Sequence, residues 1–582
     1  YGDHRDLHYP LRRQRQMCIR DRSGVDQDAF VSSFDEISEV TLKDKVESLL
    51  DLVVLTVEES YLSTLESNSD VESISDPTIL PEPMVTYPTE PVGFGTTSYV
   101  SSTFTLATEK GEQYLPYQCY YDTDQIQPQA GLVNTDIVEP KLGAQSGISL
   151  FNDDYTRKYE AAEYFQKYTG KHVDVVILDQ PMAYDSEEWY SPSTNTSRFV
   201  QYQWFNQLNS IVTSIDDDGF TPPTGNVTYH QNSALEKSHG QHVGGTVAGQ
   251  YYGWANEANI YSLTKLGSFL SGQTISGYLI YDYLRAFHLH KAVNPVTGRR
   301  NPTITNHSYG GIYYLNPENE VLSFSKLISV FYRGVTYNSG NPGPSGWSQS
   351  GVETDFGLRF DITNYPFYSA ALGSDIQDAI DDGVIFITAA GNDDLLVADP
   401  SSSDWNNTFT FEYSSGDNRT NFYNRGSWPS APDTDAIVVG ALSNEIDFKR
   451  AAFSMFGAGL DIYAPGERII SCYGNTGTND TKYSAGSANY YAIASGTSMA
   501  SPQVAGVVAT LATAKPRFTN SDVKGYIQRH SKDDDMPSGT IPNKYLISKN
   551  PRPTSGMIED VKGERKTSGM TFPRRATLNY VA

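Results

Sequence analysis

Cysteine, long apolar runs and positive charge are all scarce in this chain of 582 residues. Its three cysteines, Cys18, Cys119 and Cys472, are too few for a disulfide framework and lack the spacing of a metal site. No stretch approaches the ~18 consecutive apolar residues of a membrane-spanning helix. Lys and Arg number 43 against 69 Asp and Glu, and the resulting net charge of −26 disfavours non-specific binding to nucleic acids or anionic membranes. We therefore expect no nucleic-acid partner and no membrane span.

The start of the chain raises a question of origin. "MCIRDR" at residues 17–22 is what the DNA ATGTGTATAAGAGACAG, followed by one more base, can encode, and that DNA resembles a transposase sequencing adapter. We expect residues 1–22 to be a translated library artefact on a truncated environmental gene; the alternative is a native basic terminus. A secretion signal can be lost with such a truncation, so its absence carries no information about location.

Composition divides the remainder into four parts. Residues 23–85 include a predicted strand, short helix and strand within 52–76. Residues 86–145 are rich in Pro, Thr, Tyr and Gly, which predicts a linker or extended arm. Residues 146–545 have the pattern of one large domain, and 546–582 form a C-terminal extension.

Within the large domain, short apolar strands alternate with helices, which predicts a doubly wound, mostly parallel α/β sheet with helices on both faces. Near-continuous apolar runs of the kind buried in parallel sheets lie at 172–179, 259–266, 302–308, 383–391 and 436–442. Helices are predicted at 159–170, 277–292 and 374–383. The last of these is expected to begin with Ser374 as N-cap and to end before Gly383.

Polar residues stand beyond the carboxyl ends of the predicted strands, which is where such sheets bind ligands. Asp179 ends the strand "VDVVILD", and Asn392 follows the strand "GVIFITAAG". His239 begins the glycine-rich helix "HGQHVGGTVAG", in which His242 is assigned a structural role. With Ser498, these residues bring a carboxylate, an imidazole, an amide and a hydroxyl to one edge of the sheet.

The stretch "AIASGTSMASPQVAGV" places three serines before an apolar helix. Small neighbours let a side chain approach a substrate backbone, and Gly496 permits a tight turn into the helix. Pro502 is tolerated only near a first helical turn. Ser498 therefore fits the mouth of the helix, where unpaired N–H groups and the positive dipole end favour a developing oxyanion. Ser495 and Ser501 are interpreted as packing or capping residues.

These motifs resemble the subtilisin-like serine proteases, or subtilases, over most of residues 146–535. "SGTSMASP" and "AAGN" match the family's patterns, and "NHSYGG" fits the Ser-x-Gly-Gly wall of its substrate groove. "HGQHVGGT" matches except at Gln241, where the family has threonine. The aspartate motif departs most, because Asp179 is followed by Gln180 and Pro181 instead of Thr-Gly or Ser-Gly. The turn behind this carboxylate must therefore differ.

The resemblance implies an endopeptidase that works through an acyl-enzyme. Ser498 is the implied nucleophile, His239 the general base that accepts its proton, and Asp179 the carboxylate that orients the imidazole. The Asn392 side chain and the Ser498 N–H would bind the oxyanion. No cofactor is required. The resemblance allows structural Ca²⁺, but no loop has clear ligand spacing, so no metal-ligating residue is assigned.

Two walls of the substrate groove follow from the same resemblance: Ser308, Tyr309 and Gly310, and Ala389, Ala390 and Gly391. Small residues along a slot suit apolar or aromatic side chains. Because no acidic residue is identifiable at the pocket floor, we do not expect cleavage after paired basic residues. Insertions at 182–235, 312–372 and 393–430 leave from the edge that carries the chemistry and are expected to narrow or lengthen the cleft.

The resemblance also implies partners and a location. Residues 23–85 look like an inhibitory propeptide whose exit, "SISDPTILPEPM", lies in the groove until it is cut. The expected partners are protein or peptide substrates and the chain's own propeptide, and the expected location is extracellular. Two alternatives stay open. One is a structural or binding protein of a virion or cell surface that keeps a protease fold, and the other is a peptide ligase that uses the same site.

Overall fold

The computed structural model describes residues 168–530, apart from gaps at 216–220, 236–237, 251–252, 443–449, 475–481 and 485–489 and at residues 276, 278, 319 and 468. It also describes residues 64 and 68 and the short strands given below at either end of this range. The predicted arm at 86–145, the tail at 546–582 and most of the predicted helix at 159–170 lie outside the described residues.

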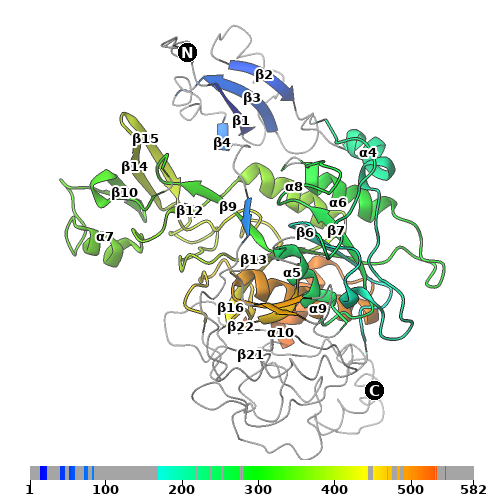
Figure 1. The fold of residues 1–582 in the computed structure, drawn as a ribbon. Helices are drawn as coiled ribbons and strands as arrows, with labels where there is room; N and C mark the ends of the chain where they lie inside the picture. Colours follow the sequence, from blue (N-terminus) through cyan, green and yellow to red (C-terminus); the bar gives the residue numbers. More distant parts are fainter. Residues whose placement is uncertain are drawn as a thin grey trace, which may run out of the picture.

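An eight-stranded sheet forms the centre of the protein, in the order β21-β22-β17-β16-β13-β8-β6-β7 (Figure 1). Neighbours from β7 to β22 run parallel, and β21 pairs with β22 in the antiparallel sense. The strands are Asp174–Asp179 (β6), Asn259–Thr264 (β7), Thr303–His307 (β8), Ile385–Ala389 (β13), Ile437–Leu442 (β16), Ile462–Pro465 (β17), Lys532–Asp533 (β21) and Lys544–Tyr545 (β22). The predicted parallel α/β sheet is confirmed.

Helices cover both faces of this sheet, which explains why every residue of β6 and β16 is buried. Figure 1 shows α6 and α8 on one side and α5 and α9 on the other. The helices are Trp204–Ile215 (α4), His239–Ala248 (α5), Leu279–His290 (α6), Ala370–Asp381 (α8), Thr497–Ala514 (α9) and Asn520–His530 (α10), with a 3₁₀ turn at Glu187–Trp189 (η4).

One predicted helix boundary is wrong. Helix α8 begins earlier than expected, with Ser369 as its N-cap, and the Ser369 hydroxyl accepts a hydrogen bond from the backbone N–H of Leu372. Ser374 lies inside the helix, where its hydroxyl donates to the carbonyl of Ala370. Gly383 follows the C-cap with φ of +106°, as the sequence predicted. Ser369 and Ser374 could each cap this helix. The residues Ala-Ala-Leu between them favour the helical conformation, so the helix begins at the earlier serine.

The strand order places a topological switch beside β6. The chain passes from β6 to β7 on one side and then returns to β8 on the other side of β6. Connections that leave in opposite directions open a crevice at the carboxyl ends of the two strands, where ligands of doubly wound sheets bind. Asp179 ends β6 at this point.

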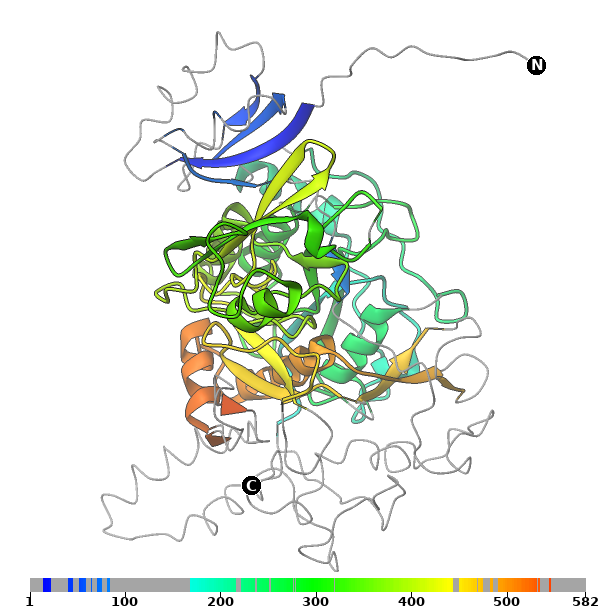
Figure 2. The same cartoon turned by 90° about the vertical axis from the view of Figure 1, so that its left-hand side faces the viewer.

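Two of the predicted insertions fold together into a lobe. Strands β10 (Leu327–Tyr332) and β11 (Val335–Tyr337) come from the insertion at 312–372, and β14 (Thr408–Ser414) and β15 (Asp417–Phe422) from that at 393–430. They form one antiparallel sheet, β11-β10-β14-β15. Helix α7 (Gln349–Phe356) and a 3₁₀ turn at Phe324–Lys326 (η5) complete the lobe, which Figure 2 shows from its own side.

Strand β9 (Tyr309–Tyr314) connects the lobe to the central domain. It pairs with β12 (Asn364–Pro366) along one edge and with β5 (Pro81–Pro83) along the other, both antiparallel. Pro81 is opposite Gly311, whose N–H donates to Trp428 and whose carbonyl accepts from Phe367. Because Gly311 bonds elsewhere, the absence of an N–H on Pro81 costs this pairing nothing.

The N-terminal strands form a separate antiparallel sheet in the order β2-β3-β1-β4. They are Gln14–Asp21 (β1), Val40–Lys45 (β2), Leu52–Glu58 (β3) and Val71–Ser75 (β4), and β1 and β4 contact α8. The two strands predicted within 52–76 are β3 and β4, and Thr64 between them is helical. Strand β1 belongs to the stretch expected to derive from an adapter, and the DNA origin of that stretch stays a prediction.

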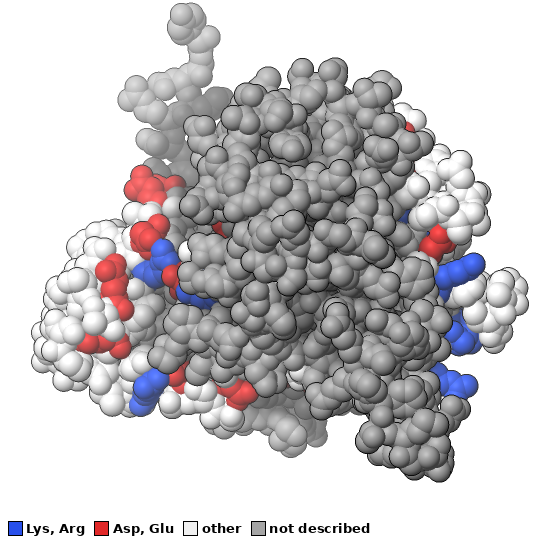
Figure 3. Space-filling model, turned by 90° about the horizontal axis from the view of Figure 1, so that it is seen from below, with Lys and Arg blue, Asp and Glu red and all other residues white. Residues whose placement is uncertain are grey.

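A three-stranded sheet, β18-β20-β19, packs against α5 through β18. Its strands are Ile469–Tyr473, Tyr490–Ala494 and Lys482–Ser484, respectively. Among the described residues, no helix combines the length and apolar character needed to cross a bilayer. Where described residues are visible in Figure 3, acidic and basic side chains both occur along the margins.

Candidate active site

Asp179 and His239 form a buried pair at the carboxyl end of β6. The Nδ1 of His239 is 2.7 Å from Oδ1 of Asp179, and both side chains are almost fully inaccessible to solvent. The carboxylate can only accept, so Nδ1 carries the proton and Nε2 is left as the basic nitrogen. Among the described residues, neither His239 Nε2 nor Asp179 Oδ2 has a hydrogen-bond partner.

The unusual turn after Asp179 holds the histidine helix in place. The backbone N–H of Gln180 donates to Asp179 Oδ1 at 2.6 Å, and its side-chain Oε1 accepts from the N–H of His239 at 2.9 Å. Ser238, the N-cap of α5, donates its hydroxyl to the carbonyl of Pro181. A Cβ on Gly240 would lie 2.2 Å from the carbonyl oxygen of Gln180, so only glycine allows this close approach. The departure in sequence therefore replaces one turn with another and keeps the carboxylate against the imidazole.

His242 is held in a structural position one turn further along α5. Its Nε2 lies 3.1 Å from the carbonyl oxygens of both Ile469 and Ala492, so it joins α5 to the β18-β20 sheet. Burial and the nearby His239 lower the pKa of His242 to about 3. It is therefore neutral and donates from Nε2, which agrees with its predicted structural role.

Ser498 lies in the first turn of α9 and is buried. Its Oγ donates to the carbonyl of Ser308 at 2.9 Å, and the Ser308 hydroxyl donates back to the Ser498 carbonyl at 3.0 Å. The structure thus brings the serine to the edge that carries Asp179 and His239, with its hydroxyl turned toward β9 and not bonded to His239. A rotation about χ1 is the motion that would redirect Oγ.

A network of hydrogen bonds that the sequence analysis missed supports this arrangement. Asn306 on β8 donates to the hydroxyl of Ser308 at 2.9 Å and accepts from the hydroxyl of Ser501 at 2.7 Å. All three side chains are fully buried. A polar residue inside the apolar run "TITNHS" was the available signal, because buried amides require partners.

Asn392 is oriented by the residue before the serine. Its Oδ1 accepts from both the N–H and the hydroxyl of Thr497, each at 2.9 Å. The Thr497 hydroxyl also accepts from the N–H of Gly391 at 3.1 Å, which ties the end of β13 to the start of α9. Since the oxygen of the amide is fixed, its NH₂ group is the end that remains for a ligand.

The two predicted groove walls lie at the carboxyl ends of β8 and β13, which are neighbouring parallel strands. Ala389 ends β13 and the N–H of Ala390 donates to Val439, so this wall is fixed to β16. At Gly391, φ is +117° and a Cβ would lie 2.6 Å from the sulfur of Met455. In the other wall, the ring of Tyr309 is fully buried, and its centroid lies 5.6 Å from that of Trp428. Only the backbone of Tyr309 is therefore available to line the groove.

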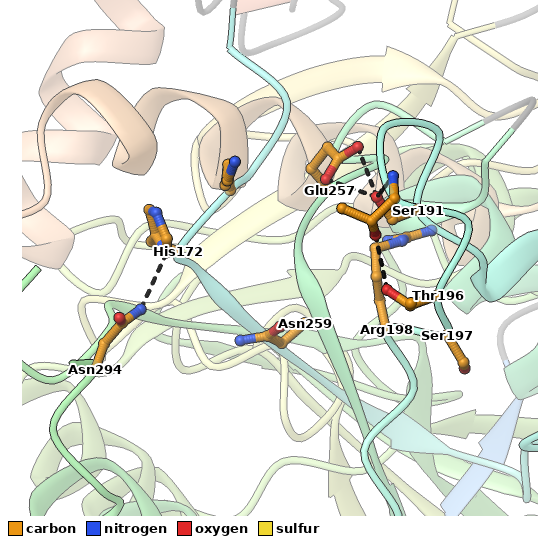
Figure 4. Close-up of a pocket in the computed structure, with 10 residues that line it drawn as sticks. His172, Ser191, Thr196, Ser197, Arg198, Glu257, Asn259 and Asn294 are labelled. Atoms are coloured by element: carbon orange, nitrogen blue, oxygen red, sulfur yellow. Dashed lines mark hydrogen bonds between the residues drawn. The ribbon is translucent and has the colours of Figure 1, made fainter. Parts of the chain in front are cut away.

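A polar pocket lies at the opposite end of the sheet (Figure 4). Its groups largely bond to one another: the hydroxyl of Ser191 donates to Glu257 at 2.9 Å, and the side chains of His172 and Asn294 are 3.0 Å apart. No group of three or more His, Cys, Asp or Glu within the described residues is arranged to hold a metal ion. The structural Ca²⁺ that the resemblance allows is therefore still without an assigned site.

Comparisons with known proteins agree with the fold and the motifs. A family model described as the subtilase family matches residues 149–546. Subtilisin amylosacchariticus of Bacillus subtilis subsp. amylosacchariticus is 30% identical over 227 residues, 38% of this chain and 49% of that protein. The subtilisin of Bacillus pumilus is 30% identical over 227 residues, 38% of this chain and 67% of that protein.

A crystal structure of a cold-adapted subtilisin-like serine proteinase aligns with a TM-score of 0.38 and 22% identity, covering 67% of this chain and 94% of that one. The chain spans about half the length of the first curated relatives that it matches.

Proposed function

The chain belongs to the subtilase family, and from that premise we propose that it is a serine endopeptidase whose nucleophile is Ser498. The observation that carries the proposal is the buried pair of His239 and Asp179 on the same sheet edge as Ser498. A hydroxyl is a weak nucleophile unless an adjacent base takes its proton, and a buried imidazole with its Nδ1 proton held by a carboxylate is such a base.

The proposed reaction begins when Ser498 Oγ turns from the Ser308 carbonyl to His239 Nε2. Nε2 takes the proton as Oγ attacks the substrate carbonyl, and the resulting imidazolium is stabilised by Asp179. The imidazolium then protonates the leaving amine as the peptide C–N bond breaks, which leaves an acyl group on Oγ. Nε2 then takes a proton from water as the water oxygen attacks this ester. The acyl C–Oγ bond breaks, the imidazolium returns the proton to Oγ, and the acid product and free Ser498 are released.

The tetrahedral oxyanion would be bound by the NH₂ group of Asn392 and the backbone N–H of Ser498. The two hydrogen bonds from Thr497 to the Asn392 oxygen support this role, because they present the amide with its donors free. The first turn of α9 adds the positive end of its dipole. Removing one such side-chain donor costs about 3–4 kcal/mol of transition-state stabilisation, a magnitude known for a subtilisin itself.

We also propose that residues 23–85 act as an inhibitory propeptide and that the enzyme is secreted as a zymogen. The antiparallel pairing of β5 with β9 supports inhibition, because it occupies the edge of the predicted groove wall. Contacts of β4 with α8 support docking of this segment on the central domain. Peptide substrates would add to β9 in the same way, by strand pairing.

A fluorophosphonate probe tests the proposed nucleophile. We expect residues 23–582 to be labelled on Ser498, and the Ser498→Ala variant, folded to the same extent, to remain unlabelled. Labelling that persists in the variant, or folded wild type that never labels and cleaves no peptide, would reject the proposal and favour a structural protein. Product masses in the presence of an added amine separate hydrolysis from peptide ligation.

A further inference from the structure

Lys265 carries a positive charge at the edge of the candidate active site. It follows β7, and its backbone N–H donates to the carbonyl of Asp179 at 2.9 Å. Its Nζ lies 5.4 Å from the ring centroid of Trp428. Within the described part of the chain, Nζ makes no hydrogen bond and no ion pair, although acidic residues outnumber basic ones. Burial lowers its pKa to about 8, so the ammonium is still mostly protonated at neutral pH.

Gly277 lies beside this ammonium. A Cβ on Gly277 would lie 3.4 Å from Lys265 Nζ, an ordinary contact distance, so no side chain of residue 277 stands between the ammonium and a ligand. Both residues are only partly buried, which leaves the ammonium within reach of a ligand. An ammonium that has lost part of its water and has gained no counter-ion binds an incoming carboxylate with little further desolvation cost.

The pairing of β5 with β9 shows how a peptide would run past this point. Pro81 is opposite Gly311 and Pro83 is opposite Tyr309, so each step along the peptide moves one residue back along β9. The next peptide residue faces Ser308, whose carbonyl accepts the hydrogen bond from Ser498. The residue opposite Ser308 therefore precedes the bond that is cut, and the residue opposite Gly311 is the fourth before it.

The direction of that fourth side chain follows from Gly311. Directly opposed residues of an antiparallel pair point to the same face of the sheet. A Cβ on Gly311 would lie 3.4 Å from the ring of Trp428 and 3.2 Å from that of Phe367. A substrate side chain at the fourth position thus projects toward Trp428, beside which Lys265 Nζ is held.

We infer that Lys265 selects substrates with Asp or Glu at the fourth position before the bond that is cut. The inference rests on the proposed peptidase function and names the substrate class of that site. The chain's own β5 has proline at this position, so it fills the groove without using the ammonium. A charge-assisted contact of this kind is expected to favour Glu over its neutral isostere Gln by about tenfold.

Four quenched peptides based on residues 78–88 test this, with Glu, Gln, Leu or Lys in place of Pro81. At pH 7, we expect kcat/KM for the Glu peptide to exceed that for the Gln peptide about tenfold. In Lys265→Met the ratio should fall to about one, while Lys265→Arg should keep most of it. Lys326→Met is the matched control, because it removes an exposed lysine that pairs with Glu412 in the lobe, and it should leave the ratio unchanged.

A second measurement separates this inference from the proposed function. In a Ser498→Ala background, the Glu and Gln peptides should differ about tenfold in affinity by calorimetry, whether or not the active protein cleaves anything. The tethered β5 weakens both peptides equally and leaves their ratio intact. Equal affinities, or a Glu preference that survives Lys265→Met, would overturn the role of Lys265 even if Ser498 labels and cleaves. A preserved affinity ratio with no cleavage would instead reject the peptidase.

Discussion

Strand β6 begins and ends with a buried aspartate, and the two carboxylates differ in how far they are satisfied. Asp174, at the amino end, accepts from the side chains of Asn259 and Asn301 and forms an ion pair with Lys291 at 2.8 Å. Asp179, at the carboxyl end, uses only one of its oxygens among the described residues. The same strand thus carries a completed polar cluster at one end and an incomplete one at the other.

The cations beside these aspartates show the same contrast. Lys291 is 6% exposed and bonds to both Asp174 and Thr303. Lys265, directly after the neighbouring β7, has no hydrogen-bond or ion-pair partner among the residues that the structure describes. Buried groups that are fully paired contribute to a unique fold, whereas groups left partly paired are available to a substrate. Changes at the two ends should therefore separate activity from stability.

The largest expected effect is on turnover, at the carboxyl end. Asp179→Asn should lower kcat by ~10⁴-fold, the size such a substitution has in serine proteases, because the amide favours the wrong imidazole tautomer. The midpoint of unfolding should change little, since the volume is kept. Hydrolysis of a peptide library by matched amounts of folded protein measures the loss. A loss below tenfold would show that Asp179 does not orient the base.

A smaller effect, on stability, is expected at the amino end. Lys291→Met should destabilise the fold by about 3–5 kcal/mol, because it leaves the buried Asp174 without its cation. Denaturant unfolding in a Ser498→Ala background measures this without self-digestion. Adding Asp174→Asn should recover part of the loss, while Lys326→Met, at an exposed pair, should cost about 1 kcal/mol or less. Equal costs for the buried and exposed lysines would remove the contrast between the two ends.

The smallest expected effect is on the pH dependence of stability. It concerns Asp393, which follows Asn392 beyond the carboxyl end of β13. Burial raises the pKa of Asp393 to about 6, and Arg359 opposes this only in part. Between about pH 4 and pH 6 the folded protein holds a proton that the unfolded chain has lost, so this group lowers stability as the pH rises. Asp393→Asn should therefore gain roughly 1–3 kcal/mol over wild type between pH 4 and pH 7.

Thermal unfolding at both pH values measures the gain from Asp393→Asn. The exposed Asp381, whose carboxylate accepts from Gln377 on α8, supplies the control: Asp381→Asn should shift both midpoints alike. A gain for Asp393→Asn that does not depend on pH would contradict the burial of its charge.

The parts of this fold that follow from local chemistry could be predicted. Five of the eight strands of the central sheet, β6, β7, β8, β13 and β16, were recognisable because burial on both faces demands apolar runs, whereas β17, β21 and β22 have four residues or fewer and were not predicted. Asp179, Asn392 and Ser498 were recognisable because they lie at or close to the ends of elements. The lobe could not be predicted, because β10 and β14 pair across about 80 residues of sequence and no local pattern fixes such a partner.

The hydrogen-bond partners within the site could not be predicted, because several donors and acceptors were chemically equivalent candidates. Gln180 could have been a surface residue, yet its side chain accepts the N–H of His239 and replaces the family's usual turn. The hydroxyl of Ser498 donates to the carbonyl of Ser308 in the structure, whereas the family motif alone predicts that it donates to His239. A sequence identifies such donors but does not rank their acceptors, since the differences are about 1 kcal/mol per hydrogen bond.

Strand β9 is paired along both of its edges, with β12 and with β5. A strand has only two edges, so the edge of β9 that faces the groove can pair with one extended chain at a time. An incoming peptide must therefore displace residues 81–83. Because those residues belong to the same molecule, their local concentration at β9 does not fall when the protein is diluted. We therefore expect the first exchange at this edge to be unimolecular, with a half-time that does not change when the protein is diluted.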